Sequence, residues 1–358
     1  MRERILLRRS AAMRTRVILN PRAGGAEALA EIREALGRLP GAEVCETRGE
    51  GHGAELAREA VEDGVDLIVA AGGDGTLNEV LNGMAIGLPG VRLGVLPLGT
   101  GNDFVRSIGV PAGLDEAVAV LARGRTRRID VARASAGETT RYFLNMAAGG
   151  FSNEVDEVLD SEVKRRWGPL AYIRSAAEAI PELTAHHARI VLDGGEELTA
   201  DLYAIVVANA RYVASGIPAA PSARLDDGAL DVVIFREATP AQIAGLIPRA
   251  LLGRHEDSEH VIWRRAQRVE VDSEPPIPFN ADGEPIGETP AAFEILPRAL
   301  EIVCGELVHE GEDGDRAEAV ERGGGDTDGP EAAGPEVGGP AAARAGSGDG
   351  AQSGRAPS

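Results

Sequence analysis

The sequence predicts an α/β domain followed by a β-rich domain, and three observations support this fold class. In the first third, short apolar runs alternate with segments of helical periodicity, which is typical of a doubly wound, mainly parallel sheet with helices on both faces. After about residue 125, apolar runs follow one another with few helical segments between them, which indicates a mainly antiparallel sheet. From residue 310 onward Gly, Ala, Pro and acidic residues dominate, which predicts a disordered acidic tail over 310–358.

The elements of the first domain, 14–125, follow one another in chain order. Arg16–Leu19 is the first predicted strand, and Leu29, Ile32 and Leu36 recur after it at helical spacing. The remaining segments are a strand at 43–47, a helix around 56–61, a strand at 66–71, a helix beginning near residue 77, a strand at 92–98 and a helix through 114–121. Strands separated by helices predict crossover connections and hence parallel pairing.

The second domain, 126–299, is predicted to consist mainly of strands. The candidates are RIDVARA, RYFLNMA, ARIVLD, LYAIVVA, LDVVIF, RVEVD, AAFEIL and ALEIV. Two helices are expected to interrupt them, at 152–180 and at 240–252.

Composition and charge restrict the classes of function. The formal net charge is -20 and Lys164 is the only lysine, so the chain is not expected to bind nucleic acid, which requires a basic surface. Cys45 and Cys304 lie far apart, so neither a disulfide framework nor a zinc site is expected, and a reducing cytoplasm is the predicted location. No apolar run is long enough for a membrane-spanning helix, and the N-terminus does not resemble a secretory signal; Met13 is an alternative start to Met1.

The segment GGDGTLNEV, residues 72–80, directly follows a predicted buried strand. Gly72, Gly73 and Gly75 allow backbone amide groups to approach a phosphate closely, and the helix beyond Thr76 would direct its N-terminal amides at the same anion. The segment lacks the lysine of a Walker loop. The alternative is a simple strand-to-helix turn in which Asp74 caps the helix.

Two further polar loops favour the phosphate site over the simple turn. They are NPRAGG, 20–25, and PLGTGNDF, 97–104, and each follows a predicted strand of the parallel sheet. Because ligands bind at the carboxyl ends of such strands, we expect the three loops to meet there and hold a nucleotide. The predicted contacts are Asn20, Gly99, Thr100 and Asn102, with Asp74 and Asp103 holding Mg²⁺ directly or through water. For Asp103 a helix cap is the alternative.

These loops, together with RLDDGALDV at 224–232 and FNADGEPIGE at 279–288, resemble the diacylglycerol kinase catalytic-domain family, specifically the soluble bacterial and archaeal lipid kinases. The family is related to sphingosine kinases and NAD kinases, and the resemblance covers about residues 16–307. It implies transfer of the γ-phosphoryl group of ATP, with Mg²⁺, to the hydroxyl of a lipid, with diacylglycerol as the first candidate. It also implies that a strand near 300–308 returns to the first domain.

The resemblance assigns roles to residues of the second domain. It makes Asp282 the base that accepts the proton of the lipid hydroxyl, with Glu284 as a Mg²⁺-binding or orienting carboxylate. From the residues alone, Asp282-Gly283 is also a favoured hairpin turn. Family members can hold a structural divalent ion near RLDDGALDV, for which Asp227 is the candidate ligand, although Arg224 stands where another oxygen ligand is expected.

The expected partners follow from the same resemblance. A lipid substrate requires transient, peripheral contact with the inner face of the membrane, for which 164–172 and 243–252 are the candidate segments. Relatives make a homodimer a further expectation. Two alternatives remain open: a kinase of a soluble alcohol, similar to NAD kinases, and a non-catalytic nucleotide or lipid sensor. Arg106, after the third loop, is expected to reach phosphate or to pair with an acid.

Overall fold

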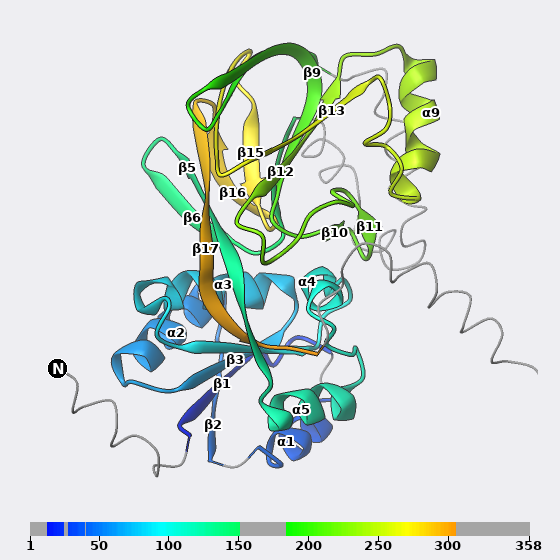
Figure 1. Ribbon diagram of the computed structural model, residues 1–358. Helices are drawn as coiled ribbons and strands as arrows, with labels where there is room; N and C mark the ends of the chain where they lie inside the picture. The colour runs from blue at the N-terminus through cyan, green and yellow to red at the C-terminus, as the bar shows by residue number, and fades with distance from the viewer. Residues whose placement is uncertain (1–12, 25–27, 40, 151–183, 306–358) are drawn as a thin grey trace, which may run out of the picture. The chain divides into compact units, whose positions relative to one another are not determined.

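The computed structural model describes residues 13–24, 28–39, 41–150 and 184–305 (Figure 1). The predicted helix at 152–180, the membrane-contact candidate at 164–172 and the predicted tail at 310–358 lie outside the described residues. None of the described helices is long and apolar enough to span a membrane.

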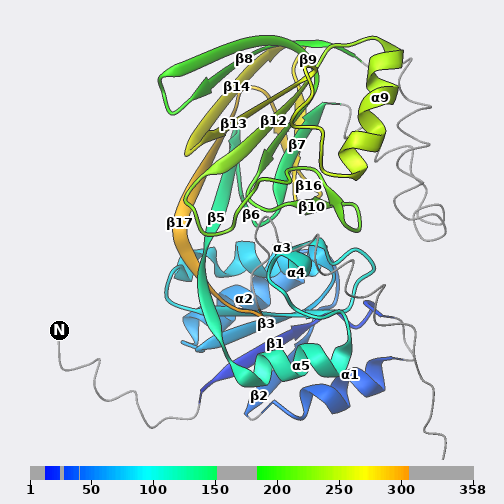
Figure 2. The ribbon, with the colours of Figure 1, turned by 45° about the vertical axis from the view of Figure 1, so that its right-hand side comes forward.

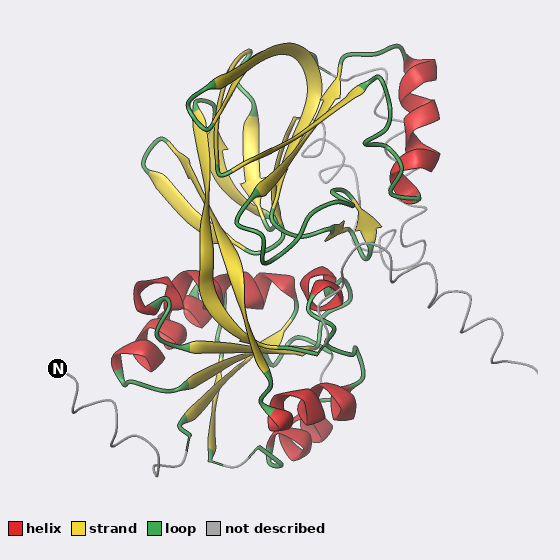
Figure 3. Ribbon diagram, in the orientation of Figure 1, coloured by secondary structure: helices red, strands yellow, loops and turns green. Residues whose placement is uncertain are grey.

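The first half alternates strands and helices. In chain order its elements are β1 (Thr15–Leu19), α1 (Leu29–Leu36), β2 (Ala42–Glu46), α2 (His52–Glu62), β3 (Leu67–Gly72), α3 (Asp74–Met84), the 3₁₀ turn η2 (Ala85–Gly87), β4 (Arg92–Pro97), α4 (Asp103–Ser107) and α5 (Leu114–Arg123). Strands β2, β1, β3 and β4 lie side by side in this order and run parallel. Helices α1 and α5 cover one face of this sheet and α2 and α3 the other (Figure 3).

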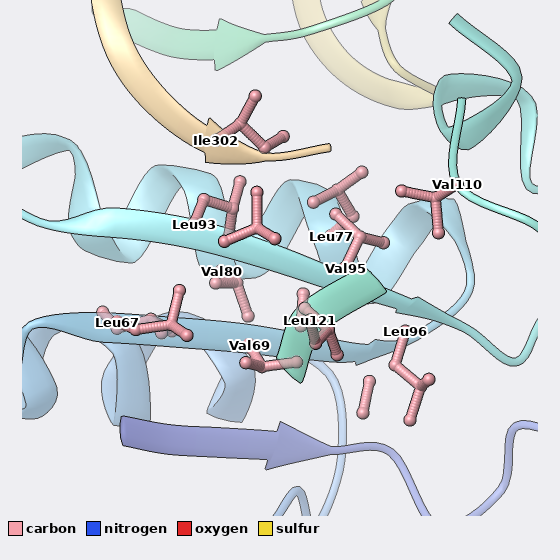
Figure 4. Packing of buried hydrophobic residues seen from close by; sticks show 14 of the residues in the cluster. Leu67, Val69, Leu77, Val80, Leu93, Val95, Leu96, Val110, Leu121 and Ile302 are labelled. Carbon is pink, nitrogen blue, oxygen red and sulfur yellow. The ribbon is translucent and has the colours of Figure 1, made fainter. Parts of the chain in front are cut away.

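The apolar runs of the parallel strands explain why the sheet is buried on both faces. Every residue of β1 and β3 is buried, as continuous apolar runs in parallel strands predict. Leu67 and Val69 of β3, Val95 of β4 and Leu121 of α5 form part of one core (Figure 4).

The second half consists mainly of strands. Its elements are β5 (Thr126–Ala136), β6 (Thr139–Phe143), β7 (Met146–Gly150), β8 (His186–Leu192), β9 (Glu196–Ala208), β10 (Tyr212–Val213), β11 (Ile217–Pro218), β12 (Leu230–Arg236), α9 (Pro240–Leu251), β13 (Val261–Ala266), β14 (Arg268–Glu274), β15 (Pro278–Ala281), β16 (Glu284–Glu288) and β17 (Ala291–Val303). The order β16-β15-β7-β9-β8-β14-β17 runs across the sheet, and β12 joins β9. Neighbours within this order are antiparallel. The predicted fold class, a parallel α/β domain followed by a β-rich antiparallel domain, is therefore confirmed.

The long strands β5 and β17 run from the parallel part into the antiparallel part of one continuous sheet (Figures 1 and 2). They pair with each other along their lengths, and Glu301 and Ile302 at the end of β17 pair in parallel with β4. The sequence predicted AAFEIL and ALEIV as separate strands, whereas the structure has one strand whose register shifts between Leu296 and Leu300. Pro297 lacks the N–H that regular pairing needs, which accounts for an irregularity at this point.

Other predictions of strands need correction. RYFLNMA was predicted as one strand, but β6 ends at Phe143 and β7 begins at Met146. The strands β13, β15 and β16 were not predicted, since β13 contains two consecutive arginines and the other two are short and contain proline. Both kinds of sequence weaken the strand pattern.

Candidate functional site

The three glycine-rich loops meet at the carboxyl ends of β1, β3 and β4. A Cβ atom on Gly99 would lie only 2.6 Å from the Cα of Gly73, so the close contact between the second and third loops requires glycine at position 99. A Cβ atom on Gly24, in the first loop, would lie 3.7 Å from the carbonyl oxygen of Leu98. The predicted convergence of these loops is thus present in the fold.

The first loop is fastened to the start of α3. The Nδ2 group of Asn20 donates a hydrogen bond to Oγ1 of the buried Thr76 (3.2 Å), and Oδ1 of Asn20 accepts one from the backbone of Arg22 (3.0 Å). Helix α3 begins at Asp74, earlier than the predicted position near Leu77, so Gly75 and Thr76 lie in its first turn. The N-terminal amides and partial positive charge of α3 are therefore placed at the loops.

Asn102 holds the third loop in shape. Its Oδ1 accepts a hydrogen bond from the N–H of Gly99 (3.2 Å) and its Nδ2 donates to the carbonyl oxygen of Gly99 (2.6 Å). Asn102 has a φ of 49°, in the left-handed region that asparagine tolerates better than most residues. Its predicted contact with nucleotide stays a prediction, as does that of Thr100, which is exposed in the same loop.

Asp74 and Asp103 lie next to each other beside the loops. Oδ2 of Asp74 accepts a hydrogen bond from the N–H of Asp103 (3.3 Å), and a Cβ atom on Gly101 would lie 3.1 Å from that oxygen and 3.7 Å from Oδ2 of Asp103. Oδ2 of Asp103 also accepts a hydrogen bond from the N–H of Ser215 (3.1 Å), in the turn between β10 and β11. Burial raises the pKa of Asp103, which the Ser215 N–H opposes and the charge of Asp74 reinforces.

The two carboxylates provide a test of whether Mg²⁺ fits here. Oδ1 of Asp103 is buried and has no hydrogen-bond partner among the described residues. Nowhere in the described ranges do three or more His, Cys, Asp or Glu side chains gather as a metal site. Mg²⁺ commonly uses one or two carboxylates and takes its other ligands from water and substrate phosphates. The residues present therefore fit a Mg²⁺ ion that is bound by these two carboxylates, by water and by the phosphates of a nucleotide.

Asp282 lies in the hairpin turn that the sequence left open as an alternative to a catalytic role. It forms, with Gly283, the turn between β15 and β16, where both residues have positive φ (49° and 86°). Its carboxylate accepts three backbone hydrogen bonds from the segment between β6 and β7: Oδ2 from Leu144 (2.8 Å), and Oδ1 from Asn145 and Met146 (3.0 Å each). Three consecutive N–H groups form a concave anion-binding site that fixes the position of this carboxylate.

The electrostatics of Asp282 suit a base. Burial raises the pKa of Asp282 to about 6, and the charge of Asp74 adds to this rise, whereas the three N–H donors act in the opposite direction. A carboxyl group with this pKa is ionised at neutral pH and is a better proton acceptor than an ordinary aspartate. The charge of Asp74 contributes to the raised pKa of both Asp103 and Asp282, so the three carboxylates interact electrostatically.

The remaining predicted residues lie apart from this contact network. Glu284, the first residue of β16, is half-buried and two positions from Asp282. Asp227 forms an ion pair with Arg265 and accepts a hydrogen bond from the N–H of Ala229 (3.2 Å). A guanidinium already balances its charge, so a role in holding a structural ion stays a prediction.

Sequence reasoning missed two contributors to the site. Ser215 supplies a backbone amide, and the only signal for it is the Ser-Gly pair in ASGIP. The segment Leu144–Met146 supplies three, and its signal is Asn145, a polar residue within an apolar run. Arg106 lies near the first of these contributors: a Cβ atom on Gly216, next to Ser215, would be 3.5 Å from its Cζ, and its charge lowers the pKa of Asp103.

Comparisons with known proteins agree with this arrangement. Residues 14–134 match the diacylglycerol kinase catalytic domain, and residues 145–304 match the YegS C-terminal NAD kinase beta sandwich-like domain. The chain is 32% identical over 293 residues to a diacylglycerol kinase of Staphylococcus carnosus (strain TM300), covering 81% of this chain and 94% of the relative. It is 33% identical over 297 residues to one of Staphylococcus aureus (strain bovine RF122 / ET3-1), covering 81% and 91%.

Solved structures give the same result. A crystal structure of a candidate diacylglycerol kinase from Bacillus anthracis str. Sterne superposes with a TM-score of 0.72 at 26% identity, covering 84% of this chain and 99% of that one. Sequence relatives, structural relatives and the site point to one conclusion: the chain belongs to the diacylglycerol kinase family and is a lipid kinase.

Proposed function

We propose that this lipid kinase transfers the γ-phosphoryl group of ATP, with Mg²⁺, to the free hydroxyl of a diacylglycerol. The observation that carries the proposal is the placement of Asp282, whose carboxylate is held by three backbone amides and lies within electrostatic range of Asp74 at the start of α3. A positioned base beside a phosphate-binding helix terminus supplies what phosphoryl transfer chiefly requires, which is alignment and charge stabilisation.

The triphosphate is proposed to lie against the loops at Gly72–Gly75 and Gly99–Asn102. The touching glycines leave backbone amides at the surface of these loops, and the N-terminus of α3 favours negative charge at the same place. Asp74 and Asp103 would hold the Mg²⁺ ion. When bound, that ion neutralises negative charge on the phosphates as the transfer proceeds.

Asp282 is proposed to accept the proton of the lipid hydroxyl. The hydroxyl oxygen forms a bond to the γ-phosphorus as the bond between that phosphorus and the β,γ-bridging oxygen breaks, so ADP leaves and a lipid phosphate forms. Among the described residues, Oδ2 of Asp282 accepts one backbone hydrogen bond, from Leu144, which leaves a lone pair for the substrate proton. Glu284, two residues further on, is proposed to orient the hydroxyl or to contact Mg²⁺.

The test is transfer of radiolabelled γ-phosphate from ATP to dioleoylglycerol in mixed micelles. Asp282→Asn should lower kcat by about 10²–10⁴-fold, the usual contribution of a general base, while leaving the Kd for ATP unchanged. Asp231→Asn is a matched control, since Asp231 is another buried carboxylate of the same half of the chain whose pKa burial raises to about 6. Full activity in Asp282→Asn would remove the proposed base.

The acceptor is tested separately. Phosphorylation of a water-soluble alcohol such as NAD in detergent-free buffer, without transfer to dioleoylglycerol, would replace the lipid proposal by the soluble-alcohol alternative. Tight ATP binding with no turnover on any acceptor would favour a sensor instead. Neither result would contradict the proposed nucleotide site, because both concern the acceptor.

A lipid substrate also implies transient contact with the inner membrane face. Leu252, which follows α9, keeps 70% of its side chain exposed and is the most exposed large apolar residue of the described ranges. Leu252→Glu should reduce sedimentation with phosphatidylcholine vesicles containing dioleoylglycerol and leave the Kd for ATP unchanged. A homodimer is proposed from the family relationship alone, and light scattering after size-exclusion chromatography tests it.

A further inference from the structure

Helix α3 is linked to the edge of β6 by the side chain of Asn82. Its Nδ2 donates a hydrogen bond to the carbonyl oxygen of Tyr142 (2.9 Å), and its Oδ1 accepts one from the N–H of Tyr142 (2.9 Å). Among the described strands, β6 pairs with β5 alone, so its other edge carries backbone groups that need partners. The side-chain amide of Asn82 thus pairs with the strand edge as a neighbouring strand would.

Asn78 holds Asn82 in this orientation. It lies one turn earlier on α3, is only 2% exposed, and its Oδ1 accepts a hydrogen bond from Nδ2 of Asn82 (3.2 Å). Asp74, Asn78 and Asn82 are spaced four residues apart, so they lie along the same side of the helix. One side of α3 therefore carries a carboxylate of the phosphate site in its first turn and the Tyr142 contact two turns later.

Only one residue separates Tyr142 from the segment that holds Asp282. Phe143 is fully buried in the core of the second half, and the next three residues donate their N–H groups to the Asp282 carboxylate. Two residues span at most about 7 Å of extended chain. A shift of Tyr142 relative to α3 must therefore move the base relative to Asp74.

We propose that Asn82 is a positioning residue: by pairing with the backbone of Tyr142, it fixes the distance between the base Asp282 and the phosphate loop at the start of α3. This role rests on the proposed function of Asp282. Asn82 itself contacts neither substrate, because it lies two turns from the N-terminus of α3 and its amide is engaged by Asn78 and Tyr142.

The test compares Asn82→Leu with Glu79→Met. Both replacements are close in size to the original side chain, and both remove two hydrogen bonds between α3 and backbone groups. Those of Glu79, however, go to Gly51 and Gly53 at the start of α2 and not to the segment that holds Asp282. Asn82→Leu should lower kcat about 10–100-fold, since a misplacement near 1 Å can have that effect, with less than about a twofold change in the Kd for ATP. Glu79→Met should keep kcat within about twofold.

A double variant separates positioning from general destabilisation. If Asn82 acts through Asp282, Asn82→Leu should cause no further loss of the residual rate in the Asp282→Asn background, because residues that act as a unit are not additive. A loss by the same factor in both backgrounds, or an equal loss in Glu79→Met, overturns the proposal. Full activity in Asp282→Asn alone would instead overturn the proposed base.

Asn82→Asp gives an independent check, and it decides the question if the leucine variant does not fold. Aspartate keeps the acceptor for the Tyr142 N–H and loses the donor to the Tyr142 carbonyl. It should therefore retain a kcat between those of the wild type and of Asn82→Leu, again with an unchanged Kd for ATP. An activity equal to that of the wild type would show that the two-point contact is not needed.

Discussion

Gly75 gives the sharpest test of where the phosphates bind. It lies in the first turn of α3, its φ is not positive, and a Cβ atom built on it would meet no atom within 4 Å. Nothing in the described part of the chain therefore requires glycine at this position. A ligand that approaches the backbone closely explains the residue, because a methyl group would occupy the space of a phosphate oxygen.

We expect Gly75→Ala to separate stability from binding. Alanine is favoured over glycine in a helix by about 0.5–1 kcal/mol, which corresponds to an increase of about 1–4 °C in the Tm of a protein of this size. The Kd for ATP should nevertheless rise at least about tenfold, which equals a loss of about 1.4 kcal/mol of binding free energy. Differential scanning fluorimetry with and without ATP measures both effects, since a ligand raises the Tm according to its affinity.

Gly245→Ala is the matched control. Gly245 lies within α9, and a Cβ atom there would also meet nothing within 4 Å. It should raise the Tm by a similar amount and leave the ATP-induced shift unchanged. If Gly75→Ala binds ATP as tightly as the wild type, the phosphates do not lie against the first turn of α3, and the proposed nucleotide site is wrong.

Four further predictions address the same site and its surroundings. Gly99→Ala should destabilise the fold by about 1–3 kcal/mol in urea unfolding and weaken ATP binding, because its Cβ atom would clash with Gly73 at 2.6 Å; unchanged stability would contradict the loop contact. The kcat/KM for lipid should rise with pH through about 6 and then level off, because Asp282 accepts a proton only when ionised, and a flat profile between about pH 5 and 7 would refute this. Asp231→Asn should be more stable than the wild type by about 1–2 kcal/mol at about pH 8 but not at about pH 4, because the Asp231 carboxyl has a folded pKa of about 6 and the wild type loses stability as it ionises. Asparagine carries no charge and keeps the oxygen that accepts the Trp263 hydrogen bond. Equal stability of the two proteins at both pH values would contradict this prediction. EDTA should abolish phosphoryl transfer and leave the Tm of the nucleotide-free protein unchanged, because the proposed ion depends on phosphate ligands; a fall in that Tm would indicate a structural ion instead.

Helices and strands were predicted best from the sequence where one pattern of apolar residues extends over the whole element. The strands and longer helices of the first half were predicted within a few residues, because buried parallel strands are continuous apolar runs and the helices between them have a clear apolar face; the short helix α4 was not predicted. The prediction failed at Leu144 and Asn145, where an apolar run continues through a break between two strands. That break is caused by a distant carboxylate, Asp282, whose effect no local pattern can show.

The site was predictable to the extent that its residues belong to short motifs. Asp74, Asp103 and Asp282 were all singled out as candidates from such motifs, but the groups that orient them were not. These groups are largely backbone amides, such as that of Ser215, and a backbone amide has no signature in the sequence. Their positions depend on how strands far apart in the chain pair with each other.

Asparagine side chains make several of the contacts that orient the site and that the motifs do not predict. Asn102 pairs with the backbone of Gly99, Asn82 with that of Tyr142, and the fully buried Asn209 donates to the carbonyl oxygen of Leu144 (2.8 Å). A side-chain amide carries both a donor and an acceptor, so it can satisfy a strand end or edge that no neighbouring strand reaches. Two of these contacts hold the segment that binds Asp282, one at Tyr142 just before it and one at Leu144 within it, so uncharged groups fix the position of the proposed base. Its position should consequently be insensitive to salt, unlike one fixed by surface ion pairs.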